Sequence, residues 1–331
     1  MKDLSAIQDN GLASAIQESG VDHAEEIIEL DARRRGIKSL QGIESLVNLR
    51  KLHLGRNNIS DLGPLSCLDK LTGLFLENNE IEDISPLKNL TRLPAIDVSN
   101  NRIRDVDSLG GDRKITWLNL SNNQISDITP LQKCLFLTLL NLNTNNICDL
   151  SPLKKINRIR VLSASDNVLT DLPSLSQLQS LNSLSLSRNK ITVIRFESLL
   201  SGLTHMDLSG NRIHCIDFLS KTPNLQALNL SENPIDVLSP AFELGNLRSL
   251  YLWHTGIDSL KGIFRLKKLK ELGVADNNIE DIGEVVQIRD LSLLFLGGNH
   301  KIPLSQLKSI KKNKIKDLRG PKWKEMKQNT I

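Results

Sequence analysis

Apolar residues recur every 22 residues along most of this sequence. The stretch LNLSNNQISDITPL, which begins at Leu118, has near-copies that begin at Leu52 and Leu74. Counted from Ile27, the chain holds 13 repeats, the last of them partial, whose first positions are Ile27, Leu49, Leu71, Leu93, Ile115, Leu137, Ile159, Leu181, Leu203, Leu225, Leu247, Leu269 and Leu291. No insertion or deletion shifts these first positions, so each repeat is expected to form the same small structure and to stack on its neighbours.

The pattern within one repeat predicts a short strand followed by a tight return. Apolar residues occupy positions 1, 4, 6, 11 and 14, and usually 17 and 20. Strand side chains alternate, so positions 4 and 6 point inward while positions 3, 5 and 7 face solvent. Proline recurs at position 16, as at Pro64 and Pro130, and 22 residues leave room for little more than a 3-10 turn on the way back. We therefore expect an α/β repeat solenoid with a parallel β-sheet on its concave face and 3-10 turns on its convex face.

Two polar columns accompany the leucines. An asparagine amide carries two donors and an acceptor, and at position 9 it is expected to pair with backbone groups inside the bend. Aspartate at position 13, as at Asp61 and Asp127, is expected to accept a backbone N–H before the convex turn. A calcium ladder is the alternative, but one carboxylate per repeat supplies too few oxygens. We expect no metal and no cofactor. The asparagines are Asn57, Asn79, Asn101, Asn123, Asn145, Asn167, Asn189, Asn211, Asn233, Asn277 and Asn299.

The two ends lack the repeat pattern and are expected to cap the stack. Residues 1–26 precede the first repeat, and we expect two short helical turns around Gly11 to form an N-terminal helical cap. Residues 27–300 hold the repeats. Residues 301–331 are expected to form a C-terminal basic cap helix and tail, and the apolar residues on one side of that helix are Leu304, Leu307, Ile310 and Ile315.

The C-terminal segment is strongly basic, whereas the whole chain is nearly balanced. From Lys301 onward there are 10 basic and 2 acidic residues, although the chain as a whole carries only +4. The segment suits either a solvated cap or an adaptor to nucleic acid or an anionic membrane. Only Trp323 interleaves the charges and no nucleic-acid motif accompanies them, which favours the solvated cap.

The pattern L-x-x-L-x-L-x-x-N-x-[IL], with its N-x-I-x-D-[IL]-x-P-L core, resembles the short 22-residue class of leucine-rich repeats over residues 27 to about 300. That class includes the listerial internalins and the regulatory subunit of type 1 protein phosphatase. The resemblance implies a horseshoe whose concave strand face binds another protein. Internalins normally also carry a signal sequence, an immunoglobulin-like domain and a wall anchor, and none of these is evident here. The row of acids and aromatics of the phosphatase regulator is only partly matched, at Phe75, Asp97, Asp207, Tyr251 and Glu271.

Aromatic residues at solvent-facing strand positions mark the predicted binding face. The chain has only 11 aromatic residues, and Phe75, Trp117, Tyr251, Trp253 and Phe295 stand at such positions. Exposed aromatics are enriched at interface hot spots. Gly273 is expected to leave a dip between Tyr251 and Phe295; mutual covering of these two rings is the structural alternative. The predicted protein-binding residues are Phe75, Asp97, Trp117, Asp207, Tyr251, Trp253, His254, Glu271, Leu293 and Phe295.

Catalytic motifs are missing from the sequence. It contains no G-x-S-x-G, no phosphate-binding glycine loop and no H-E-x-x-H, and its six histidines are scattered. We therefore expect a non-enzymatic, monomeric scaffold that binds another protein and takes no small-molecule substrate. The alternatives are a regulatory subunit of an enzyme such as a phosphatase, or the adaptor role of the basic tail.

The cysteines and the first residues bear on localisation. Cys67, Cys134, Cys148 and Cys215 lie far apart in different repeats and form no C-x-x-C pair, which favours free thiols. The start MKDLSAIQDNGL has no apolar core segment, and the run CLFLTLL is too short to span a bilayer. A cytoplasmic protein is expected, with export by another route as the alternative.

Overall fold

The computed structural model describes residues 6–111, 113–172, 175 and 177–309. The chain divides into two compact units, Met1–Asn189 and Lys190–Ile331. The predicted basic tail beyond residue 309, with Ile310, Ile315 and Trp323, lies outside the described residues.

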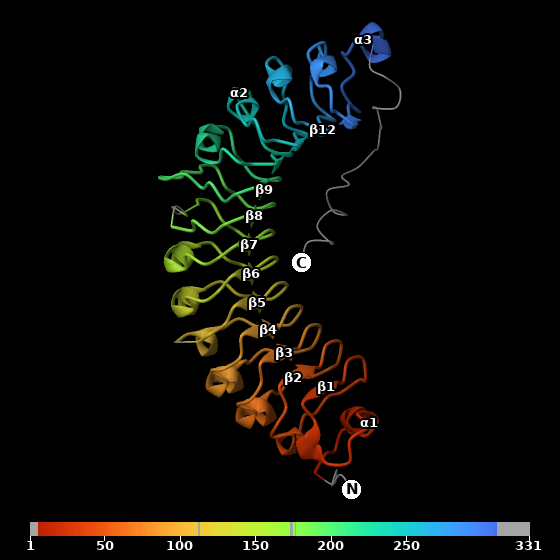
Figure 1. Cartoon of the computed structure of the whole chain (residues 1–331), viewed down its shortest axis with the longest axis vertical. Helices are drawn as coiled ribbons and strands as arrows, with labels where there is room; N and C mark the ends of the chain where they lie inside the picture. The colour runs from red at the N-terminus through yellow and green to blue at the C-terminus, as the bar shows by residue number, and fades with distance from the viewer. Residues whose placement is uncertain (1–5, 112, 173–174, 176, 310–331) are drawn as a thin grey trace. The chain divides into compact units, whose positions relative to one another are not determined.

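The first unit contains a parallel sheet with one strand per repeat (Figure 1). Each strand covers positions 3 to 5, and neighbouring strands within the unit pair at equivalent positions 22 residues apart, as Leu74 does with Ile96. The residue at position 4 is buried in every strand, as predicted. The strands are β1 (Glu29–Asp31), β2 (Lys51–His53), β3 (Gly73–Phe75), β4 (Ala95–Asp97), β5 (Trp117–Asn119), β6 (Leu139–Asn141), β7 (Val161–Ser163) and β8 (Ser183–Ser185).

The second unit repeats this arrangement. Its strands are also parallel and keep the same register, so that Leu250 lies beside Leu272. The predicted parallel strands are therefore confirmed in both units. They are β9 (His205–Asp207), β10 (Ala227–Asn229), β11 (Ser249–Tyr251), β12 (Glu271–Gly273) and β13 (Leu293–Phe295).

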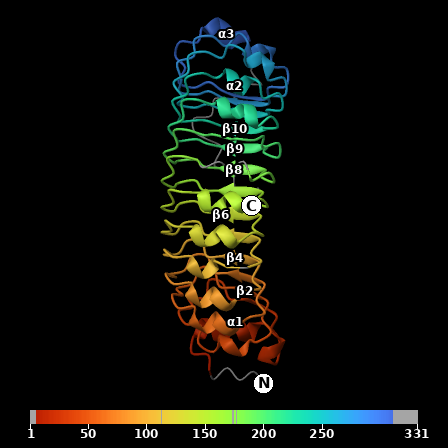
Figure 2. The same cartoon turned by 90° about the vertical axis from the view of Figure 1, so that its left-hand side faces the viewer.

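Short helical turns lie opposite the strands in each unit (Figures 1 and 2). Proline opens several of them, including Pro64 in η3, because the first helical positions need no N–H donor. The predicted 3-10 turns are confirmed, although Pro240 opens a short α-helix instead. The turns are η2 (Ile43–Ser45), η3 (Gly63–Cys67), η4 (Ser85–Asn89), η5 (Asp107–Leu109), η6 (Thr129–Lys133), η7 (Ser151–Lys155), η8 (Asp217–Lys221), α2 (Ser239–Phe242), η9 (Ile263–Arg265) and η10 (Val285–Gln287).

The asparagine column forms the predicted backbone bonds. The Asn145 amide nitrogen donates to the carbonyls of Leu120 and Leu142 at 3.0 and 3.1 Å. Its Oδ1 accepts the N–H of Ile125 at 3.0 Å. Each such side chain therefore ties two successive repeats together and satisfies groups that the bend leaves unpaired. Aspartate at position 13 also behaves as expected: Asp127 accepts the N–H of Thr129 at 2.7 Å.

Position 8 of every repeat adopts a left-handed backbone conformation. Its φ is +57° at Arg34 and +60° at Arg56, and even the β-branched Thr144 has +56°. Only Gly210 and Gly298 meet this demand without a Cβ. The bend that follows each strand thus imposes a local backbone cost in almost every repeat.

Helix α1 (Asn10–Glu18) precedes the repeats, followed by the short turn η1 (Ala24–Glu26). The short helical turns expected around Gly11 form one continuous helix, of which Gly11 is the second residue. The Asp9 carboxylate accepts the N–H groups of Gly11 and Leu12 and so begins the helix. A Cβ on Gly11 would lie 2.5 Å from the Arg35 carbonyl oxygen, so glycine permits a close approach.

Helix α3 (Leu304–Ser309) follows the last repeat. Gln306 joins it to the preceding repeat, which begins at Leu269, because its Oε1 accepts the N–H of Ile282 at 2.8 Å and its Nε2 donates to Asp281 at 2.8 Å. No helix in the described residues is both long and apolar enough to cross a bilayer. The four cysteines are free thiols, as predicted, and Cys134 is the buried one.

Candidate protein-binding surface

The solvent side of the strands, formed by positions 3, 5 and 7, is called the strand face here. Side chains at positions 4 and 6 fill the interior, so the side chains that a partner could contact on the strands are those of the strand face. The described strand face bears one aromatic group in each compact unit.

In the first unit, His53, Phe75 and Trp117 form what we call the aromatic row. The rings of His53 and Phe75 stack with centroids 4.5 Å apart and planes 4° apart. The Phe75 and Trp117 centroids are 6.1 Å apart. All three side chains are half-buried, so ring surface stays open to solvent. Leu139, exposed on the next strand, lies beside Trp117 and extends the apolar surface.

The row follows from the repeat register. Equivalent positions of neighbouring strands lie side by side, so His53 in β2 meets Phe75 in β3. Gly73 makes room for the Phe75 ring, since a Cβ there would lie 3.1 Å from it. His53 also approaches Glu29, with Nε2 3.5 Å from Oε1. The predicted residues Phe75 and Trp117 are thus placed in one cluster, and His53 is a member that the aromatic count missed.

In the second unit, Tyr251, Trp253 and Phe295 form an aromatic corner. The Trp253 ring stands edge-on to both partners, with centroids 5.5 Å from Tyr251 and 5.8 Å from Phe295. The Tyr251 hydroxyl donates to Glu271 Oε2 at 2.5 Å. Burial is the main cause that raises the Tyr251 pKa, and the bond to Glu271 raises it further.

The expectation that Tyr251 and Phe295 face solvent is wrong. Their exposed fractions are only 3% and 2%. Gly273 leaves the expected gap, but the Trp253 indole fills it and covers both neighbouring rings. Trp253 itself stays half-buried, so it is the part of the corner that a partner can reach.

The two predicted aspartates of the strand face are held by local bonds. Asp97 Oδ1 accepts the N–H of Ser99 at 2.9 Å, and Asp207 Oδ1 accepts both the N–H and the hydroxyl of Ser209. Asp207 is buried, which corrects the expectation that it faces solvent. An aspartate or asparagine side chain at position 5 thus accepts the N–H of the residue at position 7, where the chain bends. This role is structural, and the serine at position 7 of these repeats is its signal in the sequence.

The remaining predicted residues surround the corner. Leu293 and Glu271 are half-buried on paired strands. His254 is exposed at position 8, with its Nε2 3.3 Å from Asp276. These side chains form a mixed rim beside Trp253. Among the described residues, no group of three or more histidine, cysteine, aspartate or glutamate side chains could hold a metal ion.

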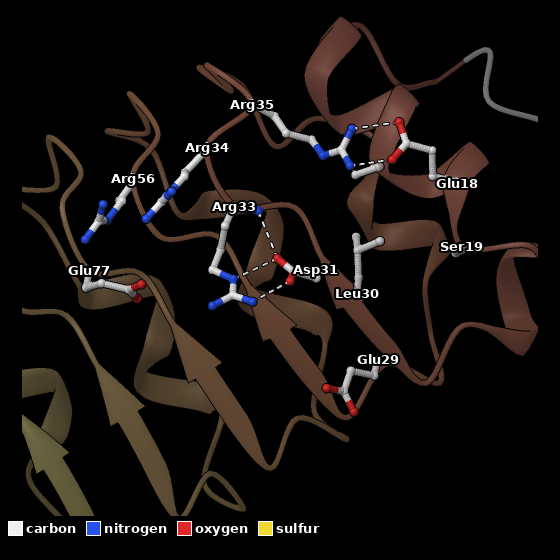
Figure 3. A pocket seen from close by; sticks show the side chains of 11 residues that line it. Glu18, Ser19, Glu29, Leu30, Asp31, Arg33, Arg34, Arg35, Arg56 and Glu77 are labelled. Carbon is white, nitrogen blue, oxygen red and sulfur yellow. Dashed lines mark hydrogen bonds and ion pairs between the residues drawn. The ribbon is translucent and has the colours of Figure 1, made fainter. Parts of the chain in front are cut away.

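A polar pocket near the first repeats was not predicted (Figure 3). Its volume is about 710 Å³, and its walls include Arg33, Arg34, Arg35, Arg56 and Glu77. The concentration of arginines in RRRG was visible in the sequence, but not which of them are already paired. The pocket shares no lining residue with the aromatic row, but the two adjoin at Glu29, which lines the pocket and approaches His53.

Several family descriptions match parts of the chain. The description "Leucine rich repeat" matches residues 179–235 and, in a second form, 45–63. "Leucine Rich repeats (2 copies)" matches residues 69–111 and 113–155. Among curated proteins, no sequence matches the chain significantly.

Solved structures give a broader match. An internalin (inlF) from Listeria monocytogenes is 30% identical, with 88% of this chain and 96% of that chain covered and a TM-score of 0.74. InlJ from the same organism is 21% identical, with 88% and 75% covered and a TM-score of 0.71. A repeat protein of Leptospira interrogans is 22% identical, with 92% and 98% covered and a TM-score of 0.66.

Proposed function

This chain is an internalin-like member of the leucine-rich repeat family, and from that premise we propose that it is a non-enzymatic scaffold that binds another protein through its strand face. The aromatic row is the observation that carries the proposal. Stacked, half-buried rings offer rigid apolar area at low entropic cost, which is the usual make-up of an interface hot spot.

Within the first unit, Phe75 and Trp117 provide the main contacts and Leu139 widens the surface. Asp97 lies between them on β4 and accepts a bond from Asn119 at 3.0 Å, so its carboxylate is fixed in place. A partner therefore meets an apolar strip with one ordered charge, which suits a protein surface of mixed character.

In the second unit, Trp253 is the contact residue, whereas Tyr251 and Phe295 support it from below. Glu271, Leu293 and His254 form its rim. A substitution of Tyr251 would therefore disturb the fold of the corner before it reported on binding. Trp253→Ala is the informative change there.

The test is capture of one partner from the native cell, followed by affinity measurements with the purified pair. We expect Phe75→Ala and Trp117→Ala each to weaken binding about tenfold or more, as hot-spot truncations do. Phe136→Ala is the matched control, because Phe136 is an exposed aromatic outside the strands. Equal binding by all three variants, with their folds intact, would remove the strand face of the first unit from the proposal.

A further inference from the structure

The pocket near the first repeats holds four arginines, and two of them are already occupied (Figure 3). Arg33 donates to Asp31 through Nε at 2.9 Å and Nη2 at 2.5 Å. Arg35 donates to Glu18 at 2.9 and 2.5 Å. Such two-pronged pairs occupy two nitrogens of each guanidinium and neutralise its charge, so these two arginines attract an anionic ligand less than an unpaired arginine does.

Arg34 and Arg56 differ from these two. Within the described part of the chain, neither guanidinium takes part in a hydrogen bond or an ion pair, and both residues are exposed. They occupy position 8 of successive repeats, with the same left-handed φ, and extend side by side in Figure 3. An arginine at position 8 can form an ion pair with the preceding repeat, as Arg188 does when it donates to Asp166.

Two like charges at equivalent positions of neighbouring repeats repel each other. An oxyanion placed between them would remove that repulsion and accept several charge-assisted hydrogen bonds. Arginine forks are well matched to a carboxylate for this purpose. The guanidinium groups of Arg34 and Arg56 are therefore the part of the pocket that can bind an anion.

The rest of the pocket limits the size of the anion. Glu18, Glu29, Asp31 and Glu77 also line it. The Glu77 carboxylate sits where a Cβ of Gly55 would be, and its buried Oε2 has no hydrogen-bond partner. A polyanion such as RNA would bring further phosphates against these acids. A single carboxylate between Arg34 and Arg56 avoids them.

We propose that Arg34 and Arg56 bind one carboxylate side chain of an acidic segment in a protein partner. This rests on the proposed function only in that the ligand belongs to a protein. The site lies at the bend after the strands, so it extends the contact beyond the aromatic row. Glu77 competes with the incoming carboxylate and weakens its binding.

The test uses a fluorescein-labelled peptide with three aspartates separated by glycine and serine, and a peptide with asparagines as its neutral counterpart. Binding to the full chain is followed by fluorescence anisotropy at low salt. We expect Arg34→Gln and Arg56→Gln each to weaken binding of the acidic peptide about two- to fivefold, the range for exposed charge pairs. Glu77→Gln is expected to strengthen it, and the neutral peptide to bind more weakly than the acidic one.

Arg188→Gln is the matched control, since it removes the same charge at the same repeat position from an arginine that already has a partner. Equal weakening by Arg34→Gln and Arg188→Gln would show bulk charge instead of a site and overturn the proposal. Weaker binding of the acidic peptide by Glu77→Gln would also overturn it. Labelled single-stranded RNA is measured in parallel, and if Arg34→Gln and Arg56→Gln weaken only the binding of the RNA, the proposal is overturned as well. Phe75→Ala should leave peptide binding unchanged, so failure here is distinct from failure of the strand-face proposal.

Discussion

The indole of Trp253 occupies the space that a side chain on Gly273 would need. A Cβ on Gly273 would lie 2.4 Å from Trp253 Nε1 and 2.7 Å from the Tyr251 ring. Glycine at this point of β12 therefore permits the edge-on contacts that Trp253 makes with Tyr251 and Phe295. The packing of the aromatic corner therefore requires glycine at position 273 as well as the three rings.

Gly273→Ala should consequently displace Trp253 and destabilise the second unit. Overpacking of this kind costs about 1–3 kcal/mol in the free energy of unfolding. Urea unfolding and near-UV circular dichroism measure the two effects. Gly245→Ala is the control, because a Cβ there meets nothing within 4 Å. Unchanged stability and an unchanged tryptophan spectrum in Gly273→Ala would contradict the packing described.

The asparagine column makes a second prediction. Asn145→Ala removes the side-chain donor bonds to the carbonyls of Leu120, Leu142 and Asn143. It also leaves the N–H of Ile125 without its acceptor. Because these groups are buried, we expect a loss of about 3 kcal/mol in urea unfolding. Asn146→Ala, one residue away and exposed, should change stability by less than about 0.5 kcal/mol. Similar losses in the two variants would rule out the proposed role of the column.

The repeat period alone was enough to predict the strands and their register. A shift of 22 residues brings equivalent positions together, so Leu74 must meet Ile96 once the repeats stack. The hydrogen bonds of the asparagine column were predicted in the same way, and the side chain of Asn145 accepts a backbone N–H as its position in the repeat indicated. Both follow from contacts that recur in every repeat.

The errors concern contacts that occur once. The burial of Tyr251 depends on Trp253 at position 7 and on Gly273 in the next strand. This combination occurs in a single pair of repeats, so the repeat pattern does not predict it. The pocket had the same difficulty. Asp31 reaches Arg33, whereas no acid among the described residues forms an ion pair with Arg34, and both outcomes depend on side-chain geometry that the repeat pattern does not fix.

The left-handed backbone at position 8 offers a gain in stability. Thr144 is exposed there at φ +56°, a conformation that a β-branched residue tolerates poorly. Thr144→Asn should stabilise the chain by about 0.5–1 kcal/mol, because asparagine visits this region at lower cost. Thr144→Val keeps the branched side chain and should give no gain. A loss of stability in Thr144→Asn would mean that the strain is relieved elsewhere.

The ion pair between Glu18 and Arg35 joins helix α1 to the first repeat and makes stability depend on pH. The hydrogen bond from Arg35 is the main cause that lowers the pKa of Glu18 to about 2, and a bond from Ser14 adds to it. The folded pKa lies below the ordinary value of 4.5, so the stabilisation is complete above that pH and is lost as the pH falls toward 2. Glu18→Gln should therefore melt at a lower temperature than the unmodified chain at pH 7, and the difference should shrink between pH 4.5 and pH 2. Glu25→Gln, an exposed change nearby, should show no such convergence. A difference that stays constant over this range would mean that Glu18 stabilises the helix without its charge.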